Sequence, residues 1–335
     1  MSDAAVRFGL LGFGKHAVRR LVPAFPACTE AVLTGAWRRD QSELGRNCSE
    51  LGIAHAFASR EALCSSPDVD VVFITSPDAM HREDALLAFA HGKSVLCEKP
   101  VAMNAGEAAE MAEAAAKAGV VYGVAQNFRW NRSLEWMREQ IRAGRIGEPQ
   151  MAHAQFAYPG DKAPRVWIAD RALACGGPIG DVGVHCIDAL RFLLGDEVET
   201  VSTLARKDAA SREVEAMASL QMEMSGGVYA TVTVSARAPY RTVIEVMGSE
   251  GVLIAENALT VDRPVEVTVR RAGELVEQTT LDNGDGYTRM LDDFARWFRG
   301  GVTFAASGAD GVTNMRVLDA AYASWRSGRR EAVAR

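Results

Sequence analysis

The first part of the chain alternates short apolar runs with helical stretches, and this alternation restricts the possible folds more than any other feature. Apolar runs at 6–11, 31–37, 54–58, 69–76, 94–98 and 120–126 predict strands, and the stretches between them, among them 83–92 and 104–119, predict helices. Strands that alternate with helices form a parallel sheet with helices on both faces. The sequence therefore predicts an α/β fold that begins with a doubly wound Rossmann domain over residues 1–125.

A glycine motif lies between the first strand and the first helix. Gly12, Gly14 and Ala17 fit the pattern G-x-G-x-x-A. The first glycine of this pattern permits a tight turn, the second lets a pyrophosphate approach the backbone, and the small third residue lets helix and strand pack closely. A purely structural turn is the alternative. The residues expected to bind a dinucleotide here are Gly12, Phe13, Gly14, Lys15 and His16.

The end of the second strand bears on which dinucleotide is bound. An NAD-binding domain usually places Asp or Glu there to accept hydrogen bonds from the ribose hydroxyls. In this chain Arg38 and Arg39 follow Trp37, and guanidinium groups suit the oxygens of a 2′-phosphate. Asp40 keeps NAD open as an alternative, because a shift of two residues restores an acid. We predict NADP as the cofactor, with NAD possible.

Polar residues also follow the later strands. Ligands of such sheets lie beyond the carboxyl ends of the strands, so we expect the segments SPDAMH (76–81) and CEKP (97–100) to lie near the cofactor. Lys99 can donate to a substrate oxygen, and Pro100 fixes φ beside it. A strand that simply reaches the surface would also end in charges. The candidates for cofactor contact are Ser76, Pro77, His81, Glu98 and Lys99.

The alternation stops after Gln126. Several short runs of alternating polarity between about 198 and 280 predict a large, open, mostly antiparallel sheet, with a hairpin at 225–227. The final stretch reads as a helix at about 309–328, which could pack back on the first domain. We therefore assign 126–335 to an α+β domain for substrate binding and oligomerisation.

One largely apolar helical segment, 176–195, carries Asp181, His185 and Asp188. Asp181 and His185 are four residues apart and so project from one helical face, which Asp188 continues. Buried polar groups need partners or a purpose. We interpret His185 as a general acid or base steadied by a carboxylate, and a hydrogen-bonded core histidine is the alternative.

Composition excludes several functions. The 335 residues carry a formal net charge of -6, which disfavours nucleic-acid binding. No apolar run reaches the length of a membrane span, and the N-terminus lacks a signal-peptide pattern, so we expect a cytoplasmic protein without membrane partners. Six cysteines and six histidines show no metal-ligand spacing, and we predict no metal site.

These motifs together resemble the glucose–fructose oxidoreductase / inositol dehydrogenase (Gfo/Idh/MocA) family. The segments that carry the resemblance are 9–17, 69–81, 95–104, 144–149, 176–195, 246–253 and the closing helix. It implies hydride transfer between NAD(P) and a sugar, polyol or related compound, with Lys99 and His185 flanking the reacting carbon and Asp181 supporting His185 or binding a substrate hydroxyl. It also implies a cis Lys99–Pro100 peptide and a homo-oligomer, a dimer or tetramer, that pairs through the open sheet.

The resemblance implies substrate contacts at Lys99, Arg129, Trp167, Asp181 and His185. Trp167 reads equally as a pocket wall or as core. Many members have Trp-Arg where this chain has Trp167-Ile168, and a proline where it has Asn131-Arg132, so the resemblance does not identify the substrate. A redox-assisted glycoside-cleaving enzyme and a non-catalytic dinucleotide sensor of the same fold are the alternatives.

Overall fold

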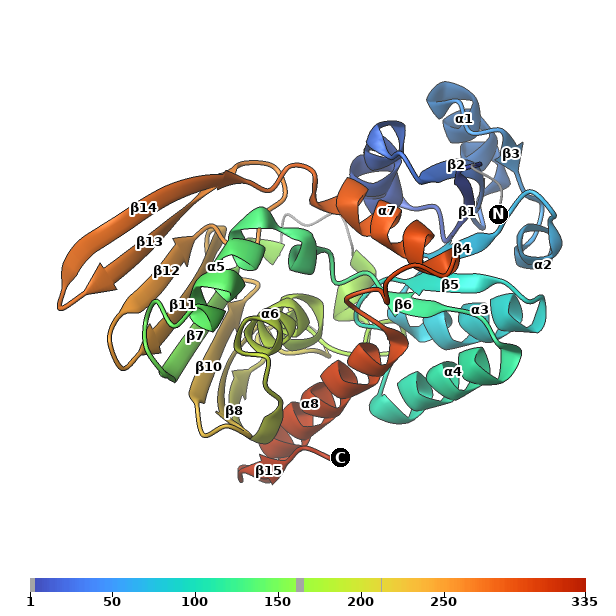
Figure 1. Cartoon of the computed structure of the whole chain (residues 1–335). Helices are drawn as coiled ribbons and strands as arrows, with labels where there is room; N and C mark the ends of the chain where they lie inside the picture. Colours follow the sequence, from blue (N-terminus) through green and yellow to red (C-terminus); the bar gives the residue numbers. More distant parts are fainter. Residues whose placement is uncertain (1–3, 161–165, 212) are drawn as a thin grey trace. The chain divides into compact units, whose positions relative to one another are not determined.

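The computed structural model describes residues 4–160, 166–211 and 213–335. It divides into two compact units (Figure 1). The first unit comprises Met1–Gln126 and Tyr287–Thr313, and the second comprises Asn127–Gly286 and Asn314–Arg335.

The first unit is built on a six-stranded sheet of order β3-β2-β1-β4-β5-β6. All five pairings are parallel, which confirms the predicted Rossmann architecture. The strands are β1 Val6–Leu11, β2 Ala31–Trp37, β3 His55–Ala56, β4 Val71–Ile74, β5 Ser94–Cys97 and β6 Tyr122–Val124. The order reverses direction between β1 and β4, so the carboxyl ends of these two strands flank the crevice where such sheets bind ligands.

Four α-helices connect these strands: α1 Gln41–Leu51, α2 Arg60–Ser65, α3 Asp78–Ala90 and α4 Ala105–Ala118. The side chain of Asn104 caps α4 by accepting from the Glu107 N–H, and Gly119 ends the helix with φ +67°. Asn at the N-cap and Gly at the C-terminal end are the residues that such positions favour. The predicted helix at 104–119 is therefore confirmed to within one residue at each end.

Helix α3 begins at Asp78, five residues before the predicted start at 83. Its first turn holds Asp78 and His81, polar residues that are buried. Because helical polar residues are usually exposed, this turn resembled a loop in the sequence. Because of this earlier start, residues 78–81 of the SPDAMH segment form the first turn of the helix that follows β4.

The segment 287–313 belongs to the first unit, although the sequence-based boundary had assigned it to the second domain. It contains most of α7, Gly286–Phe298. Phe294 is fully buried and its ring lies 6.1 Å from that of Phe8 on β1. Asp292 accepts hydrogen bonds from the backbone N–H groups of Thr29 and Glu30. The segment is held by aromatic packing and capping within the Rossmann unit, contacts that periodicity alone does not reveal.

The second unit contains a nine-stranded sheet of order β14-β13-β12-β11-β7-β10-β9-β8-β15. Every pairing is antiparallel except that of β10 with β7. The predicted open, mostly antiparallel sheet is confirmed. The strands are β7 Pro149–Ala157, β8 Val198–Arg206, β9 Met217–Met224, β10 Tyr229–Ser235, β11 Arg241–Gly248, β12 Val252–Glu256, β13 Pro264–Arg271, β14 Glu274–Asp282 and β15 Glu331–Ala332.

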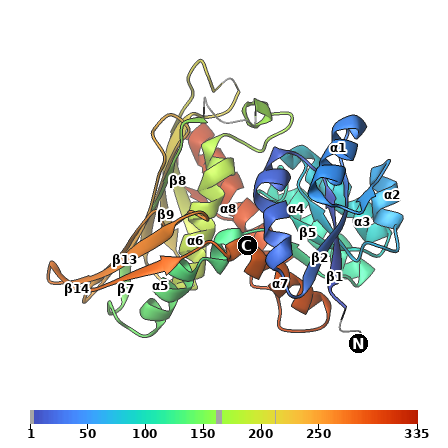
Figure 2. The same ribbon diagram turned by 90° about the horizontal axis from the view of Figure 1, so that it is seen from above.

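Helices cover one face of this sheet. In Figure 2, α5 (Arg132–Arg142) and α6 (Val184–Leu194) lie on the same side of the strands. Helix α8 spans Gly308–Ser327. From Asn314 on it belongs to the second unit, where Ser324 Oγ accepts from the Thr203 N–H of β8 at 2.9 Å. The helix predicted at 309–328 is thus present, and its residues are divided between the two units.

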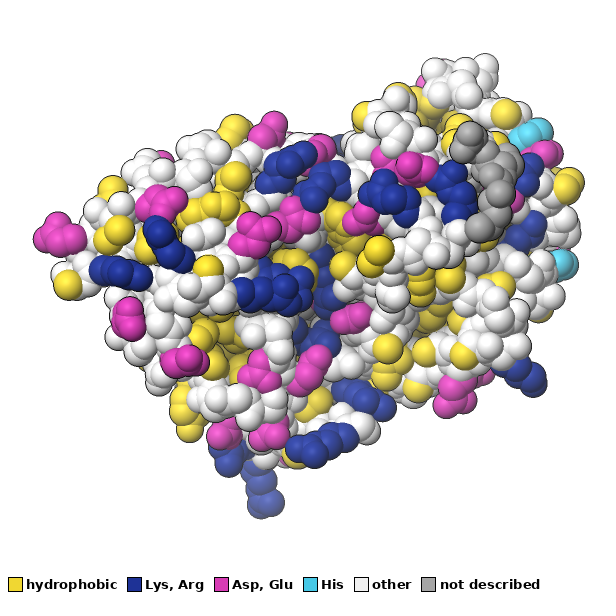
Figure 3. All heavy atoms as spheres, viewed as in Figure 1, with side chains coloured by type: hydrophobic (Ala, Val, Ile, Leu, Met, Phe, Trp, Pro, Cys, Tyr) yellow, Lys and Arg dark blue, Asp and Glu magenta, His cyan; other side chains and the backbone are white. Residues whose placement is uncertain are grey.

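The other face of the sheet carries exposed apolar side chains. Tyr229 on β10 and Met151 on β7 are paired in register and are 60% and 51% exposed. Leu204 on β8 is 79% exposed. Figure 3 is viewed from the side on which α5 lies, and there side chains of both charges are interspersed over α5 and the neighbouring strands. Apolar side chains standing out from a sheet face in this way are typical of a surface that meets a partner.

Candidate functional site

The glycine motif forms a tight turn after β1. The N–H groups of Gly12 and Phe13 both donate to the Trp37 carbonyl, at 3.0 and 2.9 Å. Gly12 has φ +94°, and a Cβ there would lie 2.4 Å from the Ser76 nitrogen, so only glycine fits. A Cβ on Gly14 would meet only the Gly12 oxygen, at 3.6 Å. The backbone at Gly14 is thus open to a ligand, as a dinucleotide cradle requires.

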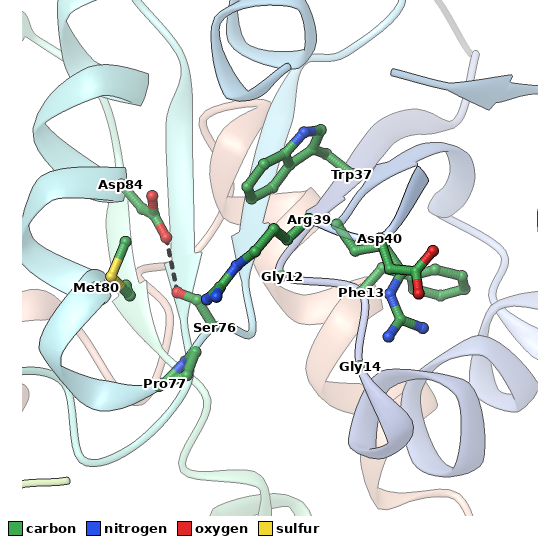
Figure 4. A pocket seen from close by; sticks show the side chains of 11 residues that line it. Gly12, Phe13, Gly14, Trp37, Arg39, Asp40, Ser76, Pro77, Met80 and Asp84 are labelled. Atoms are coloured by element: carbon green, nitrogen blue, oxygen red, sulfur yellow. Dashed lines mark hydrogen bonds between the residues drawn. The ribbon is translucent and has the colours of Figure 1, made fainter. Parts of the chain in front are cut away.

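This turn borders a pocket of about 500 Å³ (Figure 4). The lining comes from the ends of three strands and the start of α3, and consists of Gly12, Phe13, Gly14, Trp37, Arg38, Arg39, Asp40, Ser76, Pro77, Met80 and Asp84. In Figure 4 the Arg39 side chain extends in the direction of Ser76. A glycine cradle, two guanidinium groups and an apolar wall suit a phosphorylated nucleotide, so the residues present fit the predicted cofactor.

Two charged residues at the end of β2 have partners on α1. Arg38 Nη2 lies 2.8 Å from Glu43 Oε2. Asp40 is the N-cap of α1, and its Oδ1 accepts from the Glu43 N–H at 3.0 Å and from the Ser42 hydroxyl at 2.8 Å. These hydrogen bonds, that of Glu43 foremost, lower the pKa of Asp40. Asp40 therefore caps helix α1, and this makes it less suited to accept hydrogen bonds from the ribose hydroxyls of NAD.

Ser76 lines the pocket and is hydrogen-bonded to Asp84 and His81. The Ser76 hydroxyl donates to Asp84 at 2.7 Å, and Asp84 also pairs with Arg60 at 2.8 Å. His81 is 1% exposed, and its ring nitrogens lie 3.0 Å from the Pro100 oxygen and 2.8 Å from the Ser76 oxygen. His81 is absent from the described lining of the pocket and instead links the segments after β4 and β5.

Asp84 was not predicted as a pocket residue, because in the sequence it resembles an ordinary charged residue on a helix. Burial raises the pKa of Asp84, and the bonds from Ser76 and Arg60 only partly offset this. Such a residue is recognised because its charge is buried where the helix faces the end of a strand. That burial is visible only in the tertiary structure.

Glu98 joins the glycine segment to the segment after β5. His16 Nε2 lies 3.0 Å from Glu98 Oε1, and Glu98 Oε2 accepts from the Lys99 N–H at 3.2 Å. Burial by itself would raise the pKa of Glu98, but the charge and hydrogen bond of His16, together with the charge and backbone N–H of Lys99, more than offset it, so this pKa lies below its ordinary value. The Lys99–Pro100 peptide is cis, as the resemblance implies. Lys15, the residue before His16, is exposed.

In the second unit, Asp181 and His185 lie where helical geometry changes. A π-helical turn, η6 Ile179–Gly183, leads into α6. Hydrogen bonds in a π-turn run from i to i+5, and such turns are frequent at functional sites. The wider turn alters the spacing expected for positions i and i+4 of a regular helix. Asp181 and His185 are 4% and 7% exposed.

Aromatic side chains surround this pair. The His185 ring lies 4.5 Å from that of Phe128, edge to face, and 6.4 Å from that of Phe156. Tyr158 donates its hydroxyl to Asp181 Oδ2 at 2.8 Å. Sequence reasoning missed Tyr158, which follows β7 directly. Asp181 and His185 are thus nearly shielded from water among aromatic rings, and an imidazole and a carboxylate are groups that can take up and release protons.

Asp188 does not share the partner of Asp181. It accepts from Arg129 Nε at 2.9 Å and from Arg129 Nη2 at 2.7 Å, and from Asn314 Nδ2 at 2.8 Å. Arg129 is 7% exposed, so its guanidinium forms a buried pair that holds α6. Trp167 lies in a short 3-10 turn, Val166–Ala169, and is half-buried.

No group of three potential ligands among the described His, Cys, Asp and Glu residues is arranged to hold a metal ion. Among the described helices, none combines the length and hydropathy that crossing a membrane requires.

The Rossmann sheet and its glycine cradle define a dinucleotide-binding protein with a separate α+β unit. Two family models match the chain: "Oxidoreductase family, NAD-binding Rossmann fold" at residues 6–126 and "GFO/IDH/MocA C-terminal domain" at 134–254. The 1,5-anhydro-D-fructose reductase of Ensifer adhaerens is 34% identical over 325 residues, covering 94% of this chain and 96% of that protein.

Two further relatives agree with this match. The D-xylose 1-dehydrogenase (NADP(+)) 2 of Haloferax volcanii is 31% identical, covering 96% of this chain and 98% of that protein. The crystal structure of an aldose-aldose oxidoreductase from Caulobacter crescentus, 24% identical, superposes with a TM-score of 0.89 over 98% of this chain and 100% of that one, which shows the shared fold. The chain belongs to the Gfo/Idh/MocA family and is an oxidoreductase.

Proposed function

We propose that this oxidoreductase prefers NADP and transfers hydride to or from a carbonyl or secondary alcohol of a sugar or polyol. The observation that carries the proposal is the burial of Asp181, on the π-helical turn, and of His185, at the start of α6, in a chain that also holds a dinucleotide cradle. A titratable pair enclosed by aromatic rings is the usual setting of proton transfer.

Gly12, Phe13 and Gly14 would hold the pyrophosphate, with Glu98 and His16 fixing the adjoining backbone. The nicotinamide, when bound, supplies or accepts the hydride. The preference for NADP rests on Arg38 and Arg39, which line the pocket at the end of β2. It gains support from Asp40, whose carboxylate already accepts two hydrogen bonds at the start of α1.

In the oxidative direction His185 takes the proton of the substrate hydroxyl. Lys99 donates a hydrogen bond to the same oxygen, and its positive charge favours the alkoxide character that develops there. Asp181, with Tyr158 donating to it, orients His185 or a neighbouring hydroxyl of the substrate. In reduction the same groups return the proton to the oxygen.

The substrate class follows from the relatives. One is named for reducing 1,5-anhydro-D-fructose and another for oxidising D-xylose. Both compounds carry several hydroxyl groups, which a niche with Asp181, Tyr158 and the half-buried Trp167 can bind through hydrogen bonds and ring stacking. We infer that the substrate is carbohydrate-like, and that the enzyme assembles as a homo-oligomer through the face of the sheet bearing Met151 and Tyr229.

The test follows NADPH and NADH oxidation separately, against a panel of ketoses, osones and aldoses, and the reverse reaction with the corresponding alcohols. We expect turnover with NADPH that Lys99→Ala and His185→Asn each reduce by about 100-fold or more. Normal turnover in Lys99→Ala would refute the assignment of that residue.

A second pair of variants tests the cofactor preference. Arg39→Ala and Arg38→Ala should raise the KM for NADPH while leaving that for NADH nearly unchanged, since only the 2′-phosphate loses its partners. Arg46→Ala, on the exposed side of α1, serves as the control for loss of one positive charge. Equal effects on both nucleotides would rule out the arginines as 2′-phosphate ligands.

A further inference from the structure

We propose that Glu215 is a positioning residue that fixes the helical turn carrying Asp181, an inference that rests on the proposed function. Glu215 lies between β8 and β9, away from the sequence motifs, and is 1% exposed. Its Oε2 accepts from the Gly177 N–H at 3.1 Å, and its Oε1 accepts from the Ile179 N–H at 2.8 Å. Both donors stand at the start of the π-helical turn.

The first N–H groups of a helix have no partner within the helix. Here a carboxylate from another part of the chain accepts from two of them, as a capping residue would, and its charge suits the positive end of the helix dipole. The first helical bond then runs from the Asp181 N–H to the Gly177 oxygen, at 2.9 Å. Glu215 therefore fixes Gly177, whose carbonyl oxygen accepts the hydrogen bond from the Asp181 N–H.

Tyr322 on α8 completes this anchor. Its hydroxyl donates to Glu215 Oε1 at 3.0 Å. Burial raises the pKa of Tyr322 well above its ordinary value, and the charge of Glu215 raises it further. Tyr322 thus remains a hydrogen-bond donor at any working pH. Glu215 meets three donors with its two oxygens, which satisfies the charge that burial would otherwise penalise.

The anchor also explains two glycines of the segment GGPIGDVGVH. A Cβ on Gly177 would lie 2.2 Å from the Glu215 backbone oxygen, and a Cβ on Gly176 would lie 1.6 Å from the Tyr322 hydroxyl. The close approach of Glu215 and Tyr322 leaves no room for a side chain at either position. These glycines serve the attachment of the helix start, whereas the glycines after β1 serve a ligand.

Asp181 is consequently fixed from two sides. Glu215 fixes its backbone through Gly177, and Tyr158 fixes its carboxylate. Displacing a reacting group by about 1 Å can lower a rate by about 100-fold. If Glu215 acts by position, its loss should reduce turnover without touching nucleotide binding, because the pocket of the glycine cradle contains no residue of this anchor.

The decisive variant is Glu215→Gln, which keeps the shape but replaces one acceptor by a donor. The matched control is Glu213→Gln, whose exposed carboxylate accepts only from the Arg171 N–H among the described contacts. We expect Glu215→Gln to lower kcat by about 10- to 100-fold, to change the pH profile of kcat, and to leave the Kd of NADPH within about twofold. Glu215→Asp should restore part of the loss, because it keeps the charge but not the reach.

Hydrogen exchange of the backbone amides at 177–185 gives a readout that needs no turnover. Glu215→Gln should exchange faster over this segment while Glu213→Gln matches the wild type. If the wild type turns over no compound of the panel, the proposed function fails, and the exchange data still decide the positioning role. Unchanged exchange, or a lower Tm with an unchanged kcat and pH profile, would overturn the proposal and leave Glu215 a purely structural residue.

Discussion

Three carboxylates of the second unit, Asp181, Asp188 and Glu215, are 4%, 3% and 1% exposed. Each meets a different set of donors: a tyrosine hydroxyl, an arginine with an amide, and two backbone N–H groups with a second tyrosine. Burying a charge costs free energy unless its partners replace the lost water. The donors around each carboxylate therefore show which role the residue can take.

The pair of Arg129 and Asp188 gives a prediction of stability. Arg129→Met removes the two guanidinium hydrogen bonds of buried Asp188 and leaves Arg191 Nη1, at 3.8 Å, as its ion-pair partner. It should lower the free energy of unfolding by about 3 kcal/mol. The control is Arg132→Met, which breaks the exposed pair with Asp285 and should cost at most about 1 kcal/mol. Urea unfolding of the three proteins measures both values. Equal losses would contradict the structural role assigned to Arg129.

The lowered pKa of Glu98 predicts that the free energy of unfolding depends on pH. Its folded-state pKa lies below the ordinary value of 4.5, so the folded state favours the charged form. The resulting stabilisation is fully present above the unfolded-state pKa and disappears as pH falls through the folded-state pKa. The difference in unfolding free energy between wild type and Glu98→Gln should therefore be constant near neutrality and shrink below about pH 4.5. A difference that grows on acidification would contradict this sign.

At the scale of elements, the surroundings of individual side chains determined which helices could be predicted from the sequence. Local signals marked α4, which was predicted over 104–119 and spans Ala105–Ala118. They failed for the start of α3 and for α7, because buried polar residues or packing against distant aromatic rings decided those elements. The motifs located Ser76, Lys99, Asp181 and His185. Their partners Asp84, Tyr158 and Glu215 come from other elements, and no local pattern connects them.

Helix α7 provides a test of how the first unit is held together. Phe294 is fully buried against Phe8 and Phe304, with ring centroids 6.1 and 5.2 Å away. Phe294→Ala should destabilise the protein by about 3–5 kcal/mol through the cavity it leaves. Phe298 on the same helix is 36% exposed, and Phe298→Ala is the matched control, with a smaller loss. Comparable thermal shifts for the two variants would contradict the packing described.

At the scale of the whole molecule, the open face of the nine-stranded sheet leads to a prediction of assembly. Tyr229 and Met151 are paired across β10 and β7 and exposed on that face. Tyr229→Arg should therefore dissociate the proposed homo-oligomer, since a charge would be buried at the contact. Light scattering after size-exclusion chromatography measures the mass. Val302→Arg is the control, because Val302 is 90% exposed in a loop of the other unit. An unchanged mass for Tyr229→Arg would remove this face from consideration.

The return of residues 287–313 to the first unit has a consequence for protein synthesis. The Val124 N–H donates to the Ala306 oxygen, and β1 packs on Phe294, so the nucleotide-binding unit is incomplete until these late residues leave the ribosome. At about 5–20 residues per second, the nascent chain would wait roughly 10–40 s between the emergence of β6 and the arrival of that last segment. For that interval Phe8 lacks its contact with Phe294, and we expect the apolar surface left open there to favour chaperone binding. The same discontinuity prevents a contiguous gene segment ending at β6 from serving as an interchangeable cofactor-binding cassette.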